Sequence, residues 1–61
     1  MITRGSIWQG VEGRLFQVIA EVNVEGHDWV YYRRLDNDDE PKEFSCYTES
    51  FLSRFHKLPE N

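Results

Sequence analysis

The most regular feature of the chain is an alternation of apolar and polar residues over positions 15–24. Successive side chains of a β-strand point to opposite faces, so this alternation predicts a strand with one buried and one exposed face. The predicted inner face carries Phe16, Val18, Ala20, Val22 and Val24. The predicted outer face carries Leu15, Gln17, Ile19, Glu21 and Asn23.

A second strand is predicted for the run Trp29-Val30-Tyr31-Tyr32-Arg33-Arg34, and the turn before it decides which of its side chains are buried. A two-residue turn, Glu25-Gly26, would pair Val22 with Trp29 and Ala20 with Tyr31. That turn needs a positive φ at its first residue, where Asn or Asp is preferred to Glu. A three-residue loop over 24–26 needs a positive φ only at Gly26, as in a G1 bulge.

We favour the three-residue loop, which pairs Ala20 with Val30 and Val18 with Tyr32. It directs Val30 and Tyr32 into the core. It leaves an aromatic and arginine patch on the outer face, formed by Trp29, Tyr31 and Arg33 beside Gln17, Ile19 and Glu21.

Shorter elements surround these two strands. Further strands are predicted over 5–8, 42–47 and 56–59, with turns over 10–13 and 36–41, where Gly, Asp, Asn and Pro gather. A short helix is predicted over 48–55, with Thr48 as its N-cap and Tyr47 and Leu52 as a hydrophobic staple. The inner side of this helix is predicted to carry Phe51, Leu52 and Phe55.

This order predicts a single domain over residues 1–61, with flexible ends at 1–4 and 60–61. Short antiparallel strands in so short a chain favour a bent barrel, because closure limits exposed edges. The layout resembles the SH3-like barrels, in which a helical turn precedes the last strand. The predicted fold is therefore mainly β, a small five-stranded SH3-like barrel with one short helix before the last strand.

Composition and charge narrow the function. Nine of the 61 residues are Phe, Trp or Tyr, which supplies an aromatic core to a chain too short to bury much surface. The formal net charge of −4 argues against non-specific binding to DNA or RNA, because phosphate contacts dominate such binding. The lone Cys46 cannot form an internal disulfide, and no signal peptide or membrane-spanning run is recognisable. These features predict a soluble intracellular protein.

Several short pieces of the chain resemble a group of small proteins of unknown function that bacteriophages and prophages encode. The pieces are Gly5-x-x-Trp8, the glycine turn at Gly13, the strand ending in Val22 and Val24, Val30-Tyr31-Tyr32-Arg33-Arg34, Tyr47, and Phe51-Leu52-x-x-Phe55. The acidic segment Asp36 to Glu40 is longer than this group leads us to expect. The resemblance implies a small accessory protein in the cytoplasm of a bacterial host cell, and it supplies no catalytic residues.

The patch formed by Trp29, Tyr31 and Arg33, with Ile19 and Gln17 beside it, is the leading candidate site. Trp, Tyr and Arg dominate the residues that carry binding energy in protein interfaces. A purely structural interpretation stays open, because strongly curled strands would partly cover both faces and Arg33 would then lie over a ring.

Two charged groups offer a second candidate. Arg34, Arg54 and Lys57, with Arg33 and His56, would converge if the helix packs near the end of the third strand, and would then contact phosphate or an acidic partner. The acidic turn over 36–40 would suit mimicry of DNA, or it is a solvated turn. A calcium loop there lacks the usual glycine.

No catalytic or metal-binding motif is recognisable. Cys46 with His27 or His56 lacks the orienting group that a nucleophile and base require, and the spacing fits no metal site. We therefore expect a non-enzymatic module without cofactors or metal that binds a host or phage protein, or pairs with a second copy. The alternative is a nucleic-acid-linked role, through Arg33, Arg34, Arg54 and Lys57 or through the acidic turn.

Overall fold

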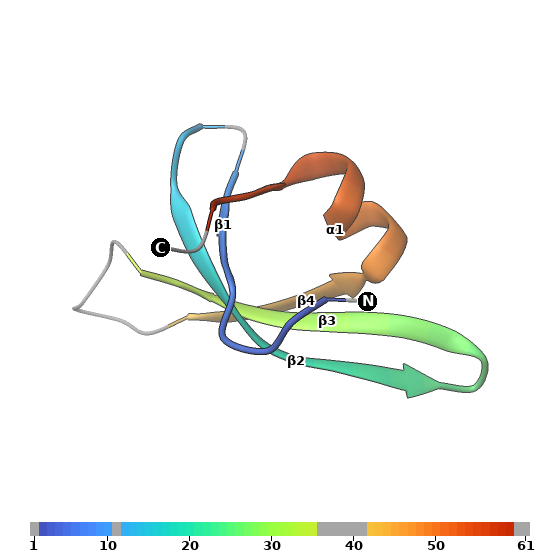
Figure 1. Ribbon diagram of the computed structural model, residues 1–61. Helices are drawn as coiled ribbons and strands as arrows, with labels where there is room; N and C mark the ends of the chain where they lie inside the picture. The colour runs from blue at the N-terminus through green and yellow to red at the C-terminus, as the bar shows by residue number, and fades with distance from the viewer. Residues whose placement is uncertain (1, 11, 36–41, 60–61) are drawn as a thin grey trace.

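The computed structural model describes residues 2–10, 12–35 and 42–59. These residues form β1 (Ile7–Gln9), β2 (Leu15–Val24), β3 (His27–Arg34), β4 (Glu43–Tyr47), α1 (Thr48–Arg54) and β5 (His56–Lys57). The strands pair antiparallel in one sheet of order β4-β3-β2-β1-β5 (Figure 1). The predicted β-rich fold with one short helix before the last strand is confirmed. The sheet is open over the described residues, so the predicted barrel is not confirmed.

The β2–β3 hairpin turns on two residues, Glu25 and Gly26, and not on the three-residue loop that we favoured. Their φ angles are 52° and 84°, both positive, as a type I′ turn requires. Trp29 therefore pairs with Val22, and the predicted pairing of Ala20 with Val30 is wrong. A left-handed non-glycine residue costs about 1–2 kcal/mol, and the pairing of two long strands outweighs that cost.

A β-bulge between Val18 and Ala20 compensates for the different turn. The register shifts there by one residue, so Val18 still lies opposite Tyr32 as predicted. A one-residue shift inverts the alternation of faces. Ala20, predicted for the inner face, therefore lies opposite Tyr31 on the outer face, as Val22 lies opposite Trp29. Glu21, predicted for the outer face, lies opposite the buried Val30.

The core lies between the sheet and α1, which packs on one side of β3 and β4 (Figure 1). Its buried hydrophobic side chains are Ile2, Trp8, Val18, Val30, Tyr32, Phe51 and Phe55. Val30 is 0% exposed and Tyr32 is buried, as the sequence predicts, whereas Trp29 is only half-buried. Ile2 is buried although we expected residues 1–4 to be flexible. Trp8 donates its indole N–H to Ser6 Oγ at 2.8 Å, which satisfies the buried nitrogen.

Helix α1 begins at Thr48, but Thr48 is not its N-cap. Tyr47 holds that position and makes no side-chain capping bond. The Thr48 hydroxyl instead donates to Glu21 Oε2 at 3.1 Å, while the backbone N–H of Ile2 donates to Glu21 Oε1 at 3.3 Å. A tertiary acceptor thus replaces the local cap. Leu52, predicted for the inner side of the helix, is 52% exposed.

Candidate functional site

The outer face of β2, β3 and β4 carries four rings, which we call the aromatic row: His27, Trp29, Tyr31 and Tyr47. Trp29 and Tyr47 are cross-strand partners, and their ring centroids lie 4.3 Å apart. The ring of His27 lies 5.6 Å from that of Tyr47. Tyr31 is 42% exposed and Tyr47 is 47% exposed. The row is therefore accessible on the side of the sheet opposite α1.

The same face ends in a polar cleft of about 520 Å³, which we call the Arg33 cleft. Its lining includes three of the predicted patch residues, Gln17, Ile19 and Arg33, together with Arg4, Gly5 and Glu43. Arg33 Nη2 donates to Gln17 Oε1 at 2.9 Å, and Gln17 Nε2 donates to the Gly5 carbonyl at 3.2 Å. These bonds fix the direction of the guanidinium on an exposed strand. The structure therefore brings together the five patch residues on one face, with Trp29 and Tyr31 in the aromatic row.

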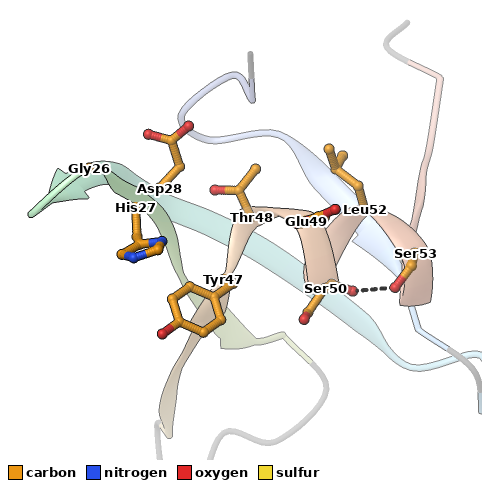
Figure 2. Close-up of a pocket in the computed structure, with 9 residues that line it drawn as sticks. All are labelled: Gly26, His27, Asp28, Tyr47, Thr48, Glu49, Ser50, Leu52 and Ser53. Carbon is orange, nitrogen blue, oxygen red and sulfur yellow. Dashed lines mark hydrogen bonds between the residues drawn. The ribbon is translucent and has the colours of Figure 1, made fainter.

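A second hollow, of about 880 Å³, lies between the tip of the β2–β3 hairpin and α1 (Figure 2). We call it the hairpin groove. Tyr47 and His27 belong to both the groove and the aromatic row, so the two surfaces are continuous. Asp28 and Glu49 give the groove an acidic lining, and Leu52 adds an apolar side chain. Sequence reasoning placed Tyr47 at the end of the strand over 42–47 and at the helix start but not in the patch, although its position opposite Trp29 follows once β3 and β4 are paired.

Of the five residues predicted to converge, Arg34 and Arg54 line one hollow of about 490 Å³, which we call the basic cleft, whereas Arg33 lines the Arg33 cleft. Lys57 does not join them, because it pairs with Trp8 at the other edge of the sheet. Two cations that sequence reasoning missed, Arg14 and Lys42, take part instead. Among the residues that the structure describes, the lining comprises Arg14, Phe16, Tyr32, Arg34, Lys42, Phe44 and Arg54. The acidic turn over 36–40 lies outside the described residues.

Tyr32 connects this cleft to the core. Burial raises the pKa of its hydroxyl above the ordinary value of 10.0, Cys46 raises it further, and the nearby Arg54 guanidinium lowers it. The hydroxyl therefore stays protonated at neutral pH, and Tyr32 serves the site as a neutral hydrogen-bonding group.

The cysteine and the histidines lie apart. Cys46 lies opposite Val30 on the core side of β4, whereas the ring of His27 packs on Tyr47 across the outer face. His56 pairs with Gln9 on β1, at the far side of the sheet. Within 2–10, 12–35 and 42–59, no group of three or more His, Cys, Asp or Glu side chains is placed to hold a metal ion.

Comparison of the chain with protein-family models, with curated proteins and with solved structures finds no match. In the part of the chain that the structure describes, no helix has the length and apolar character needed to cross a membrane.

Proposed function

We propose that the protein is a non-enzymatic interaction module that binds another protein through the aromatic row and the Arg33 cleft. The observation that carries this proposal is the exposure of Tyr31 and Tyr47, beside the half-buried Trp29, on a sheet face whose opposite side already holds the core. Aromatic and arginine side chains of this kind form the energetic centres of protein interfaces. Paired strands also present them without the entropic cost of ordering a loop.

The charges of the face define the chemistry of the partner. Among the described residues that line the cleft, Arg4 and Arg33 face a single carboxylate, that of Glu43, so the local charge balance of these residues is positive. Arg33 lies four positions after Trp29 along β3, a distance of about 13 Å at the usual rise of a strand. The partner segment therefore presents apolar side chains to the aromatic row and a carboxylate about 13 Å away.

The setting of this interaction comes from the sequence. The resemblance to short phage- and prophage-encoded proteins implies a host or phage protein as the partner, inside a bacterial cell. We infer a variant of the SH3-like barrel, and the support is the strand order together with a helix between β4 and β5.

The test is affinity capture from bacterial lysate, followed by binding measurements with the purified captured protein. The variant Trp29→Ala/Arg33→Ala removes the centre of the face. Lys57→Ala removes an exposed side chain at the far edge of the sheet and serves as the control. We expect a partner that both the natural protein and the control bind, and that the face variant binds at least about tenfold more weakly.

Equal binding by the face variant would refute the assignment of the surface. A dimer in solution that the face variant abolishes would make a second copy of the chain the occupant, in place of a different protein. Light scattering of the purified protein across a concentration series distinguishes this outcome.

A further inference from the structure

The basic cleft collects most of the positive charge of an acidic protein. The chain has seven Lys and Arg residues and a net charge of −4, and four of the seven line this one hollow. They come from separate parts of the fold: Arg14 precedes β2, Arg34 ends β3, Lys42 precedes β4 and Arg54 ends α1. Arg34 already has an interaction partner. Placing Arg14, Lys42 and Arg54 together costs free energy, which an anion bound between them would recover.

The contacts that the cations already make leave donors available. Arg14 Nε lies 3.4 Å from Glu12 Oε2, but both side chains are largely exposed, so this pair contributes little. Arg54 Nε donates to the Ser50 carbonyl at 3.4 Å, and its guanidinium lies 5.5 Å from the centre of the Phe55 ring. A guanidinium has five N–H donors. Arg14 and Arg54 therefore keep most of their donors for a ligand.

The floor of the cleft is aromatic and rigid. The ring of Tyr32 stacks on Phe44 at 5.6 Å and meets the ring of Phe16 edge-on at 5.5 Å. Phe44 is 37% exposed, so part of its ring is open to a ligand. An aromatic floor below several guanidinium groups favours a ligand that is anionic at one end and flat or apolar at the other.

A smaller hollow of about 300 Å³ adjoins the cleft and shares Arg14 and Phe16 with it. The other described residues that line it are Gly10, Glu12 and Phe55. A Cβ at Gly10 would stand 3.1 Å from the ring of Phe16 and 3.2 Å from that of Phe55. The absence of a side chain at Gly10 therefore lets its backbone lie close against both rings, at the wall of this second, more apolar compartment.

We propose that the basic cleft and the adjoining hollow bind a small organic phosphate of the nucleoside monophosphate type. The phosphate would lie among Arg14, Lys42 and Arg54, and the flat ring would lie against Phe16 and Phe55. A phosphate monoester carries up to two negative charges, and its oxygens match the fork of donors on arginine. The site shares no residue with the aromatic row or the Arg33 cleft, so it is independent of the proposed protein partner.

A single phosphate fits the charge distribution better than a nucleic-acid strand does. Affinity for a strand comes from several phosphates neutralised along a basic track. The remaining cations, Arg4, Arg33 and Lys57, are not part of this hollow, and Lys57 lies at the far edge of the sheet. A strand leaving the cleft would therefore lose its counter-charges within a short distance.

The experiment is titration of the isotope-labelled protein with AMP, followed by amide chemical shifts. Adenosine, inorganic phosphate and a single-stranded oligonucleotide of eight or so thymidines are titrated in parallel. We expect saturable shifts around the cleft with a Kd for AMP below about 10 mM, and at least about tenfold weaker binding of adenosine and of phosphate alone.

Two single variants, Arg54→Gln and Arg14→Gln, should each weaken AMP binding at least about fivefold. Lys57→Gln removes the same charge outside the cleft and should leave the affinity unchanged. The proposal is overturned if no saturable shift occurs up to about 10 mM AMP, or if adenosine binds as tightly as AMP. It is equally overturned if Lys57→Gln weakens binding as much as Arg54→Gln, which would indicate non-specific attraction. An oligonucleotide that binds far more tightly than AMP would replace the small ligand with a nucleic-acid strand.

Discussion

Replacement of Glu25 by asparagine should stabilise the protein. Glu25 has a φ of 52° in the first position of the β2–β3 turn, a left-handed conformation that a non-glycine residue adopts at a cost of about 1–2 kcal/mol. Asparagine adopts this conformation more readily and is a preferred residue of type I′ turns. Glu25 is also exposed and lies at the hairpin tip, so the substitution disturbs no packing.

We expect Glu25→Asn to raise the free energy of unfolding by about 1 kcal/mol, roughly half of the left-handed cost. For a domain of this size, such a change raises the melting temperature by about 4–8 °C. Thermal unfolding followed by far-ultraviolet circular dichroism, together with urea unfolding, measures both quantities.

The matched control is Glu25→Gln, which removes the same charge but brings no preference for the left-handed region. It should change stability by less than about 0.5 kcal/mol. Equal stabilities of the two variants would contradict the reasoning. That result would mean that Glu25 does not have a positive φ in solution, and it would favour the three-residue loop in which only Gly26 is left-handed.

Three further outcomes are expected. Val30→Asp should abolish the cooperative unfolding transition because it places an unpaired charge at a fully buried position, whereas Trp29→Ala should retain a folded amide spectrum. The reverse result would mean that the faces of β3 are exchanged. Thr48→Val should lower the free energy of unfolding by about 0.5–1.5 kcal/mol, and by clearly less in a Glu21→Ala background, because Glu21 accepts the hydrogen bond that the Thr48 hydroxyl donates. Full additivity of the two changes in urea unfolding would exclude that bond. Burial raises the pKa of Tyr32, so the folded state holds this proton to higher pH than the unfolded state does. The contribution of Tyr32 to stability should therefore be lost as pH rises above about 10. A Tyr32→Phe variant with the same alkaline loss of stability would show that another group is responsible.

The faces of β3 were predictable because a strand alternates strictly. Val30 and Tyr32 are apolar or aromatic at alternate positions, and both are buried, while Tyr31 and Arg33 point to the outer face. The turn that leads into this strand was predicted wrongly, because the poor fit of Glu to a left-handed position is a small local cost. The bulge between Val18 and Ala20 had no recognisable signal in the sequence, yet it decides which face Ala20, Val22 and Glu21 occupy.

The residues of the basic cleft were also only partly predictable from the sequence. In an antiparallel sheet, the end of one strand lies beside the starts of its two neighbours. Arg34 ends β3, and Arg14 and Lys42 precede the neighbouring strands β2 and β4. The proximity of these three of the four cations could therefore be predicted from the strand order. Arg54 joins them only because α1 packs its Phe51 and Phe55 rings against Trp8 and Tyr32.

The sequence alone therefore determined the β-rich class, the position of the short helix and the alternation of β3, since each depends on neighbouring residues or on a period of two. The tertiary structure decided the hairpin register, the bulge, the acceptor that Glu21 provides for Thr48, and the assembly of the aromatic row and the basic cleft. The register and the bulge depend on small free-energy differences between alternative pairings of β2 with β3. The other features depend on contacts between segments that are distant in the sequence, and no short stretch of sequence contains both partners.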